Sequence, residues 1–487
     1  MNKYIRAIIS NYLFFFASTV LFLVITPVAV HNMGDVLFGM WSILLAILGF
    51  SSIGDLGLGV VVNKFASEYL EDPKEICTII STGILILLPM ALISFLILII
   101  ARNFLIPTLD IPEEFLSDFE KAWVIIGLCL FPQFLSRIVH GYLYSQLKNT
   151  MLRAVEFGVQ LATWIGVIWI TAQRRDILTA AYWLLFVQIS SMCFLYYLIF
   201  RSADFRFTFK PSMVKKMTMF SFFTFLESVA VTMYQKLDRV VVGAILGPVA
   251  AGVYSVGTSV GLRISIVTGQ VTGVMVPYAS LKSSKRDNTN LEEIFNNMSR
   301  IVNLMLVVMG GLLAVWMEEI LYIWFSPEYA SNNHLIFSLL IVAYTILSQS
   351  RIGHQTLTGM GEVSFSSGIY LLMSSVMIAG IYLLSKKFGL LGAAAAQLST
   401  ILLLAYNLRV YYKLRGYVPF GMFVLENIWP LLSAATGFLL VLFGLPILSK
   451  LIFSLGIVLI STTLLLRDEF FMSQVKSALG NLSLKND

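Results

Sequence analysis

The sequence predicts an all-α, polytopic membrane protein of about fourteen transmembrane helices, arranged as two six-helix lobes followed by an extra helix pair. Two observations predict this class. Hydrophobic residues make up 58% of the 487 positions and charged residues only 12%. With a mean hydropathy of +0.85, the chain lies well outside the range of soluble globular proteins. Short strings also recur at a nearly constant spacing of 212 to 214 residues, which indicates an internal duplication.

The predicted spans follow from segment length, because about 20 apolar residues cross the hydrocarbon core of a bilayer. The segments that meet this criterion lie at 11–30, 37–61, 76–101, 122–145, 154–172, 179–200, 218–244, 251–277, 300–320, 335–358, 364–385, 390–412, 428–444 and 451–466. The connections between them are short and leave no room for a separate catalytic domain. The activity is therefore expected to reside inside the membrane.

The orientation follows from Lys and Arg, which concentrate on the cytoplasmic side of membrane proteins. About twenty of the 33 lie in connections on the side of the N-terminus, and seven lie on the opposite side. We therefore expect both termini in the cytoplasm and an uncleaved first helix after Lys3 and Arg6. The net charge of +6 follows from this topology, and we infer no nucleic-acid partner from it. Cys77, Cys129 and Cys193 lie on separate predicted helices without a CxxC motif, so neither a disulfide nor a metal cluster is expected.

Three recurrences support the duplication. Residues 33–43 match residues 246–256 at a spacing of 213, and Arg174-Arg175 precedes Lys386-Lys387 by 212. The string Ser-Arg-Ile-Val-His at 136–140 returns as Ser-Arg-Ile-Gly-His at 350–354. Each repeat holds six helices, an even number, so both copies should have the same topology and be related by a pseudo-twofold axis along the membrane normal.

These repeats give the predicted domain organisation. It comprises an N-terminal lobe (1–200), a cytoplasmic linker (201–217), a C-terminal lobe (218–412), an extra helix pair (413–466) and a cytoplasmic tail (467–487). The extra pair has no counterpart in the first repeat.

Arg137 with His140 and Arg351 with His354 are the first candidate binding residues. The members of each pair are three residues apart and therefore share one face of a helix. Arg is costly inside a hydrophobic span. Either the two arginines extend to the interface or pair with neighbouring helices for packing, or they line a cavity and hold an anionic group with the forked guanidinium. The residues leave both interpretations open.

Further charged residues lie in or near predicted spans. Arg263 lies near the middle of the eighth span, too deep to reach either surface easily, and is a candidate for binding or ion pairing. Glu227, in the seventh span, could pair with Arg263 or bind a coupling cation or proton. Asp238 could pair with Arg239 or couple ions, and Asp55 could cap a helix end or couple ions. We expect no metal site and no cofactor, apart from H⁺ or Na⁺ as a coupling ion.

No catalytic constellation is present in the sequence. It contains no His-Glu-x-x-His metal motif and no serine in a nucleophile-elbow context. The run Gly54 to Gly59 has neither the preceding strand nor the following Lys of a phosphate-binding loop. An enzymatic activity is therefore disfavoured.

The motifs resemble a known family. Met33-Gly34 through Trp41-Ser42, Asp55 to Gly59 running into Asn63-Lys64, and Asp238 through Tyr254 are similar to the polysaccharide transporters of the multidrug/oligosaccharidyl-lipid/polysaccharide exporter superfamily, over about residues 1–415. The resemblance implies an O-antigen (Wzx-type) flippase of the bacterial inner membrane. Such proteins move undecaprenyl-pyrophosphate-linked sugar units between leaflets by alternating access of two lobes. A cationic cavity suits that cargo, because a desolvated pyrophosphate needs positive partners.

The resemblance also implies partners and leaves alternatives. The implied partners are the polyprenyl-pyrophosphate-linked glycan, membrane lipid, and a glycan polymerase with its chain-length machinery. The chain departs from the commonest twelve-helix form by its last two spans, and the lipid II flippase of the superfamily also has such a pair. A lipid II-type flippase or a multidrug exporter is therefore an alternative, although the latter should have acidic residues dominating its cavity. A membrane glycan polymerase or acyltransferase is a further alternative, and usually has a long outer loop or a catalytic His.

Overall fold

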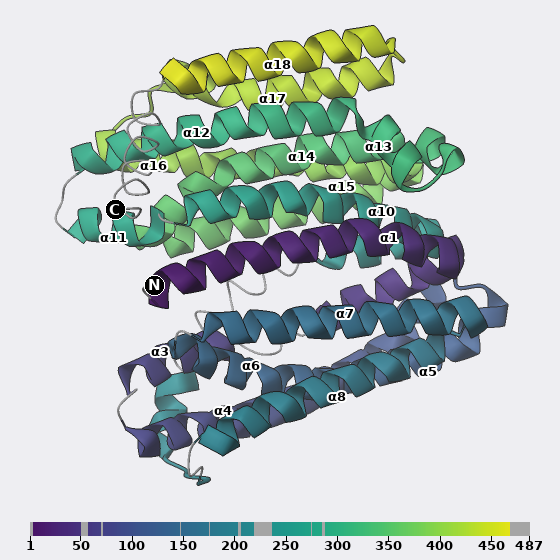
Figure 1. Cartoon of the computed structure of the whole chain (residues 1–487), viewed down its shortest axis with the longest axis vertical. Helices are drawn as coiled ribbons and strands as arrows, with labels where there is room; N and C mark the ends of the chain where they lie inside the picture. The colour runs from purple at the N-terminus through teal and green to yellow at the C-terminus, as the bar shows by residue number, and fades with distance from the viewer. Residues whose placement is uncertain are drawn as a thin grey trace, which may run out of the picture. The chain divides into compact units, whose positions relative to one another are not determined.

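The structure is a computed structural model that describes residues 3–49, 57–69, 72–146, 148–174, 176–202, 206–218, 236–273, 275–284 and 288–467. Within these ranges every regular element is a helix and no β-strand occurs (Figure 1). The predicted all-α class is confirmed. Of the candidate site residues named above, Asp55 and Glu227 lie outside the described ranges, as do Gly54 and Arg175 of the sequence motifs.

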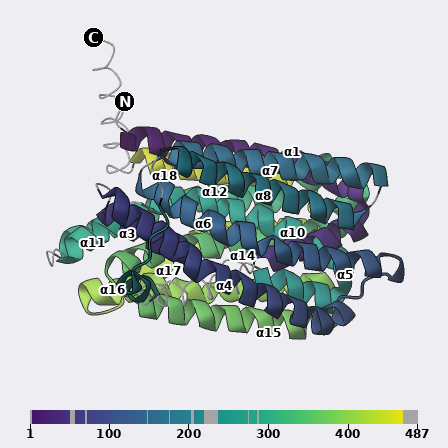
Figure 2. The same cartoon turned by 90° about the horizontal axis from the view of Figure 1, so that it is seen from below.

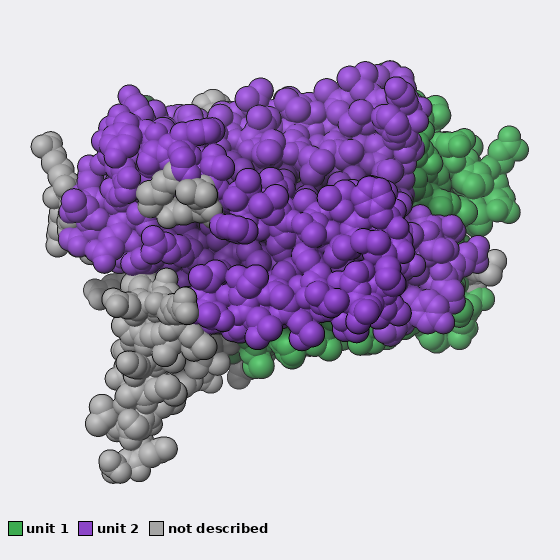
Figure 3. All heavy atoms as spheres, turned by 90° about the horizontal axis from the view of Figure 1, so that it is seen from above, with its two compact units in different colours: residues 1–255 green, residues 256–487 purple. Residues whose placement is uncertain are grey.

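The chain divides into two compact units, residues 1–255 and 256–487, which Figure 3 colours separately. The helices of the first unit are α1 (Lys3–Gly49), α3 (Leu58–Glu68), α4 (Pro73–Leu105), α5 (Glu113–Leu128), α6 (Leu130–Ser145), α7 (Asn149–Arg174) and α8 (Ile177–Ser202). The boundary falls inside α10 (Asp238–Thr272). The second unit continues with α11 (Met275–Ser284), α12 (Asn288–Val315), α13 (Met317–Trp324), α14 (Pro327–Gly359), α15 (Val363–Ala396), the 3₁₀ helix η3 (Gln397–Leu404), α16 (Ala405–Arg415), α17 (Phe420–Leu442) and α18 (Ile447–Arg467).

Most of the predicted spans are recognisable among these helices, whereas most of the span at 218–244 and residues 50–56 of the span at 37–61 lie outside the described residues. In the described residues ten helices are long and apolar enough to cross a membrane, and residues Asn427–Leu442 form a shorter apolar helix. The long helices are fewer than the predicted spans because α1, α10 and α15 each contain a break between two consecutive spans. The protein is therefore a multi-pass membrane protein.

The breaks in α1 and α10 occur at glycines with the same backbone conformation. Gly34 has φ 76° and ψ 163°, and Gly247 has φ 84° and ψ 174°. This region is essentially restricted to glycine, because any Cβ would clash there. The two glycines are 213 residues apart, so the spacing of the repeated strings recurs in the backbone geometry.

We expect Gly34→Ala and Gly247→Ala each to destabilise the protein by about 1–3 kcal/mol, the usual cost of forcing a side chain into such a conformation. Neither site is crowded, since nothing lies within 4 Å of a Cβ built on either glycine. The cost would therefore come from the backbone alone. Melting temperatures in detergent measure it, with Gly368→Ala as the matched control, because Gly368 is equally uncrowded and has no positive φ. Equal melting temperatures for all three variants would contradict the prediction.

The last two helices pack into the second unit. Ser433 on α17 donates a hydrogen bond to the Val307 carbonyl oxygen on α12 at 2.7 Å. On α18, the buried Lys450 ammonium lies 2.6 Å from a Glu319 carboxylate oxygen of α13, and Ser454 accepts a bond from the Trp316 indole at 2.8 Å. Helices α17 and α18 thus share contacts with α12 and α13. The predicted domain boundaries stay predictions.

Part of the predicted linker lies against α4. The Thr208 backbone N–H donates to Ser81 at 3.2 Å, and the hydroxyls of Thr208 and Thr78 are 2.9 Å apart. Lys210 forms an ion pair with Glu75, and the hydrogen bond to this carboxylate raises the pKa of the exposed Lys210. These contacts fix residues 206–210 to the start of α4.

Candidate functional site

Helix α6, which bears Arg137 and His140, lies among α3, α4 and α8 (Figure 2). The approach of α3 to α6 is close enough to exclude side chains at the crossing. A Cβ on Gly141 would lie 2.4 Å from the Gly59 carbonyl oxygen, and one on Gly59 would lie 3.3 Å from the Arg137 carbonyl oxygen. Two glycines therefore fix the backbone position of Arg137.

His140 belongs to a charged cluster between α6 and α7. Its Nδ1 lies 3.8 Å from Glu156 Oε1, and Arg153 binds the other oxygen of the same carboxylate at 2.7 Å. The Arg137 side chain is exposed, one turn before His140. The cluster brings one guanidinium and one imidazole to a single carboxylate.

Arg351 on α14 is half-buried and is held by α10. Its Nε–H donates to Ser265 Oγ at 2.6 Å. One turn further along α10, a Cβ on Gly269 would lie 2.8 Å from the Arg351 guanidinium nitrogen. The guanidinium therefore lies over the space that the missing side chain of Gly269 leaves on α10, which we call the Gly269 notch. The hydrogen bond to Ser265 orients the guanidinium plane. A fixed planar fork is suited to phosphate or carboxylate binding.

His354 has different neighbours from His140. Its ring lies 5.4 Å from the Tyr406 ring, and the Tyr406 hydroxyl donates to the Ser366 carbonyl oxygen at 2.8 Å. Helix α16 approaches α14 closely here, since a Cβ on Gly353 would lie 2.2 Å from Asn407 Oδ1. The two Arg–His pairs recur in sequence, but one histidine faces a carboxylate and the other an aromatic ring.

A buried amide cluster lies two residues before Arg351. The Gln349 amide donates to Asn303 Oδ1 at 3.2 Å, to the Asn427 carbonyl oxygen at 2.7 Å and to Asn427 Oδ1 at 3.2 Å. Asn407 donates to the same Asn427 side-chain oxygen at 3.2 Å. These bonds join α12, α14, α16 and α17, so the part of α14 that bears Arg351 is tied to α17 of the extra helix pair.

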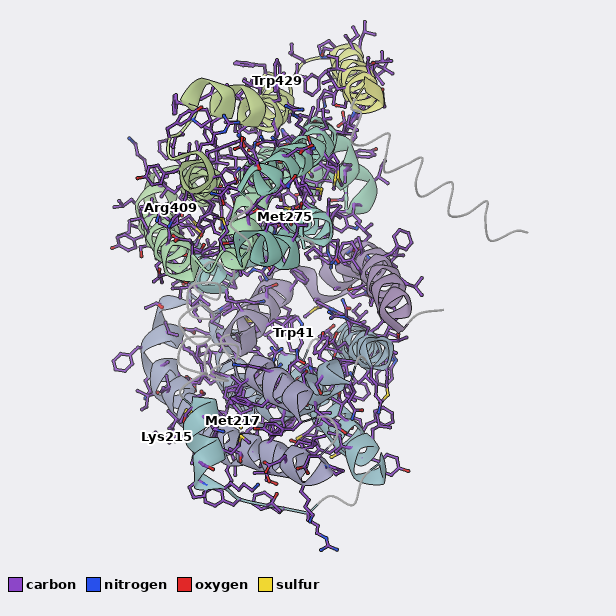
Figure 4. The ribbon with its side chains drawn as sticks, turned by 90° about the vertical axis from the view of Figure 1, so that its left-hand side faces the viewer. Trp41, Lys215, Met217, Met275, Arg409 and Trp429 are labelled. Atoms are coloured by element: carbon purple, nitrogen blue, oxygen red, sulfur yellow. The ribbon has the colours of Figure 1, made fainter. Side chains whose placement is uncertain are left out.

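Glu362, between α14 and α15, connects the end of α14 to α16. Its carboxylate lies 2.6 Å from Lys413 Nζ and 3.0 Å from an Arg409 nitrogen. Arg409, labelled in Figure 4, also lies over the Phe365 ring at 5.1 Å. The hydrogen bond from Lys413, followed by that from Arg409, lowers the pKa of Glu362.

We expect these ion pairs to contribute a pH-dependent stability. Because the folded-state pKa of Glu362 is lowered, the contribution is present above the ordinary value of 4.5 and is lost as the pH falls through the folded-state pKa. The side chains are 23–35% exposed, which limits the contribution to about 1 kcal/mol. Melting temperatures of the wild type and Glu362→Gln should differ at pH 7 and converge once the pH falls below the lowered folded-state pKa of Glu362. A difference that persists in acid would assign the effect to packing.

The remaining candidates on α10 are half-buried or buried. Arg263 is half-buried and lies two residues before Ser265, which places it about 200° around the helix from the Ser265 side chain. Asp238 is 1% exposed; the Arg239 backbone N–H donates to its Oδ1 at 2.8 Å, and its carboxylate accepts a bond from Tyr254. Among the described candidates, Arg137 and His140 lie in the first unit, and Arg263, Arg351 and His354 lie in the second. Their roles as binding and coupling residues stay predictions.

Sequence reasoning missed three polar residues of these sites. Glu156 and Gln349 are polar residues within predicted spans, and that signal could have drawn attention to them. Ser265 gives no comparable signal, because serine is common in transmembrane helices. Its role depends on a partner 86 residues away in the chain.

Comparison with known families identifies the chain. The family model described as "Polysaccharide biosynthesis protein" matches residues 5–282, which is more than half of the chain. The chain belongs to this polysaccharide biosynthesis family. The resemblance read from Met33 through Trp41 and from Asp238 through Tyr254 is thereby confirmed.

Two relatives of this polysaccharide biosynthesis family member match two thirds or more of the chain. A Shigella flexneri protein provisionally named an O-antigen transporter is 22% identical over 387 residues, which cover 78% of this chain and 91% of the relative. The uncharacterized membrane protein EpsK of Bacillus subtilis strain 168 is 22% identical over 358 residues, which cover 67% of this chain and 66% of EpsK.

Solved structures share the fold of this family member. The lipid II flippase MurJ in an inward closed conformation has a TM-score of 0.75 at 15% identity, covering 95% of this chain and 99% of that one. An inward-facing multidrug resistance transporter of the MATE family, of the MOP superfamily, has a TM-score of 0.65 at 11% identity, covering 86% and 94%. The predicted exporter-superfamily fold is therefore confirmed.

Proposed function

We propose that this protein is a flippase that translocates a polyprenyl-pyrophosphate-linked oligosaccharide, of the O-antigen type, across the bacterial inner membrane, with both termini in the cytoplasm. The observation that carries the proposal is the pair of Arg–His motifs inside spans of a polysaccharide biosynthesis family member, at Arg137 with His140 and at Arg351 with His354. Arginine at such depth is retained for a role that offsets its insertion cost. Binding of a pyrophosphate is such a role.

The geometry around Arg351 supports anion binding. The bond from Nε to Ser265 at 2.6 Å orients the guanidinium, and the notch at Gly269 accommodates one of its terminal nitrogens. A preoriented fork loses less side-chain entropy on binding a phosphate than a mobile one. The described carboxylate nearest the other pair is Glu156, which binds Arg153 and approaches His140. We assign Arg137, His140, Arg263, Arg351 and His354 to the cargo.

Transport rather than bond chemistry is proposed for this site, with H⁺ or Na⁺ as the coupling ion. Asp238 is the described coupling candidate, because its carboxylate is buried beside Tyr254. Glu227 and Asp55 complete the proposed set. The glycan polymerase and chain-length machinery that receive the translocated unit are the proposed partners.

The proposal is tested by a leaflet-protection assay. The purified protein is reconstituted in vesicles that contain a fluorescent polyprenyl-pyrophosphate oligosaccharide, lipid II in a second preparation, or a cationic drug in a third. We expect accelerated exposure of the oligosaccharide lipid in the opposite leaflet. Transport of lipid II alone, or of the cationic drug alone, would replace the proposed cargo with that of the alternative flippase or exporter.

A further inference from the structure

A groove between α7 and α8 is separate from the sites described above. The two helices lie side by side (Figure 1), and the hollow between them measures about 570 Å³. Apart from two serines of α8, its lining is apolar. Small residues of α7 (Ala154, Gly158 and Ala162) form one wall, and aromatic residues of α8 (Trp183, Phe186 and Phe194) form the other.

The groove exists because Trp183 holds the two helices apart. Small residues four apart, as at 154, 158, 162 and 166, ordinarily let two membrane helices approach closely. Here a Cβ on Gly166 would lie 1.9 Å from Trp183 Nε1, so the indole occupies that notch, and its N–H donates to the Ala162 carbonyl oxygen at 2.9 Å. Two turns earlier, nothing lies within 4 Å of a Cβ built on Gly158. The helices meet at Trp183 and stay separated along Gly158.

The groove opens away from the charged cluster. Glu156 lies two residues from both Ala154 and Gly158, about 200° around α7 from each, and faces His140 of α6 at 3.8 Å. Around the groove, large apolar side chains of α7 and α8 are exposed: Trp169 is 64% exposed and Phe186 60%. Since α7 and α8 both qualify as membrane spans, this face contacts lipid hydrocarbon.

The rim of the groove carries positive charge at the end where α7 begins. The span in α7 starts at Thr150, so Lys148 and Arg153 lie at or near the membrane surface. Lys148 is exposed and lies three residues before Met151, which lines the groove. Arg153 instead binds Glu156 in the charged cluster. Basic residues at this depth attract anionic headgroups.

We propose that the groove binds an acyl chain of an anionic phospholipid, whose headgroup lies at Lys148. The apolar walls match the hydrocarbon chain, and the cation at the rim matches the phosphate. This lipid is a resident of the protein and not its cargo, because the groove lies on a different face of α7 from the cluster that contains His140.

Native mass spectrometry tests the proposal on full-length protein taken from nanodiscs of equal parts phosphatidylglycerol and phosphatidylcholine. We expect the wild type to retain one phosphatidylglycerol, and Gly158→Leu to lower its occupancy at least fivefold, because the added side chain fills the groove. Gly456→Leu on α18 is the matched control, since it adds the same volume at another uncrowded glycine of a span. Ser190→Leu fills the groove from the α8 wall if Gly158→Leu fails to fold.

The charged rim is tested by Lys148→Gln in the same discs. We expect this variant to lose its preference for phosphatidylglycerol over phosphatidylcholine while keeping the wild-type melting temperature. Equal lipid occupancy in the wild type and both groove variants would overturn the proposal. So would a wild type that retains a polyprenyl phosphate from the cells in place of the phospholipid, because the groove would then belong to the cargo. Neither result bears on transport, which the leaflet-protection assay measures separately.

Discussion

Replacing Arg351 with Lys is expected to lower transport by roughly thirtyfold or more, because removing one partner of a buried charged hydrogen bond costs about 2–5 kcal/mol. Lysine keeps the charge but has no Nε donor, so the 2.6 Å bond to Ser265 is lost. An ammonium also cannot bind two phosphate oxygens in parallel. The measurement is the leaflet-protection rate at matched amounts of protein, together with surface glycan in cells that depend on this protein.

Two further variants make this result specific. Ser265→Ala keeps the guanidinium and removes only the group that orients it, so a smaller loss is expected than for Arg351→Lys. Lys387→Gln removes an exposed charge and should leave transport unchanged. Arg137→Lys and Arg263→Lys extend the series to the other arginines. Wild-type transport in all three arginine variants would mean that these residues serve packing.

Gln349→Leu is expected to destabilise the second unit by several kcal/mol. The Gln349 amide nitrogen is the donor to Asn303 Oδ1 and to two oxygens of Asn427. Each buried acceptor left without a donor costs about 1–3 kcal/mol, and an apolar replacement supplies none. A lowered melting temperature, with loss of protein from the membrane fraction, is the expected observation.

Ser348→Ala is the control for this variant. Ser348 is the preceding residue on α14, is also fully buried, and donates to the Tyr344 carbonyl oxygen of its own helix at 2.6 Å. Its loss should cost much less, because it breaks no bond between helices. If both variants melted at the same temperature, the amide cluster would not be what joins α14 to α17.

Most of the fold could be predicted from the sequence because span length and hydropathy depend on local composition. Spacing within the repeats was equally accessible, since it paired residues 33–43 with residues 246–256, the two strings that contain Gly34 and Gly247. The non-helical conformation of these glycines could not be predicted from that spacing, because it depends on the backbone geometry of the junction. The part of the second predicted span at 50–56 lies outside the described residues.

The candidate site was predictable only in part. The periodicity of a helix placed Arg137 and His140 on one face of their helix. It likewise placed Arg351 and His354 on one face of theirs. The partners of these residues depend on tertiary contacts. Ser265 reaches Arg351 only because Gly269 lets α10 approach α14. The difference between the two histidines could not be predicted either, since it arises from a carboxylate on α7 and a tyrosine on α16.

The breaks in α1, α10 and α15 bear on how the chain enters the membrane. Gly34, Gly247 and Gly389 are single non-helical residues within otherwise continuous helical segments. A polar loop must cross the hydrocarbon layer when the second of two spans follows the first, and each polar backbone group without a partner adds to that barrier. A junction of one residue leaves almost no backbone groups without a hydrogen-bond partner. Each of these span pairs can therefore leave the insertion machinery as a preformed helical hairpin, and lengthening any of the three junctions with polar residues should slow biogenesis without altering the finished protein.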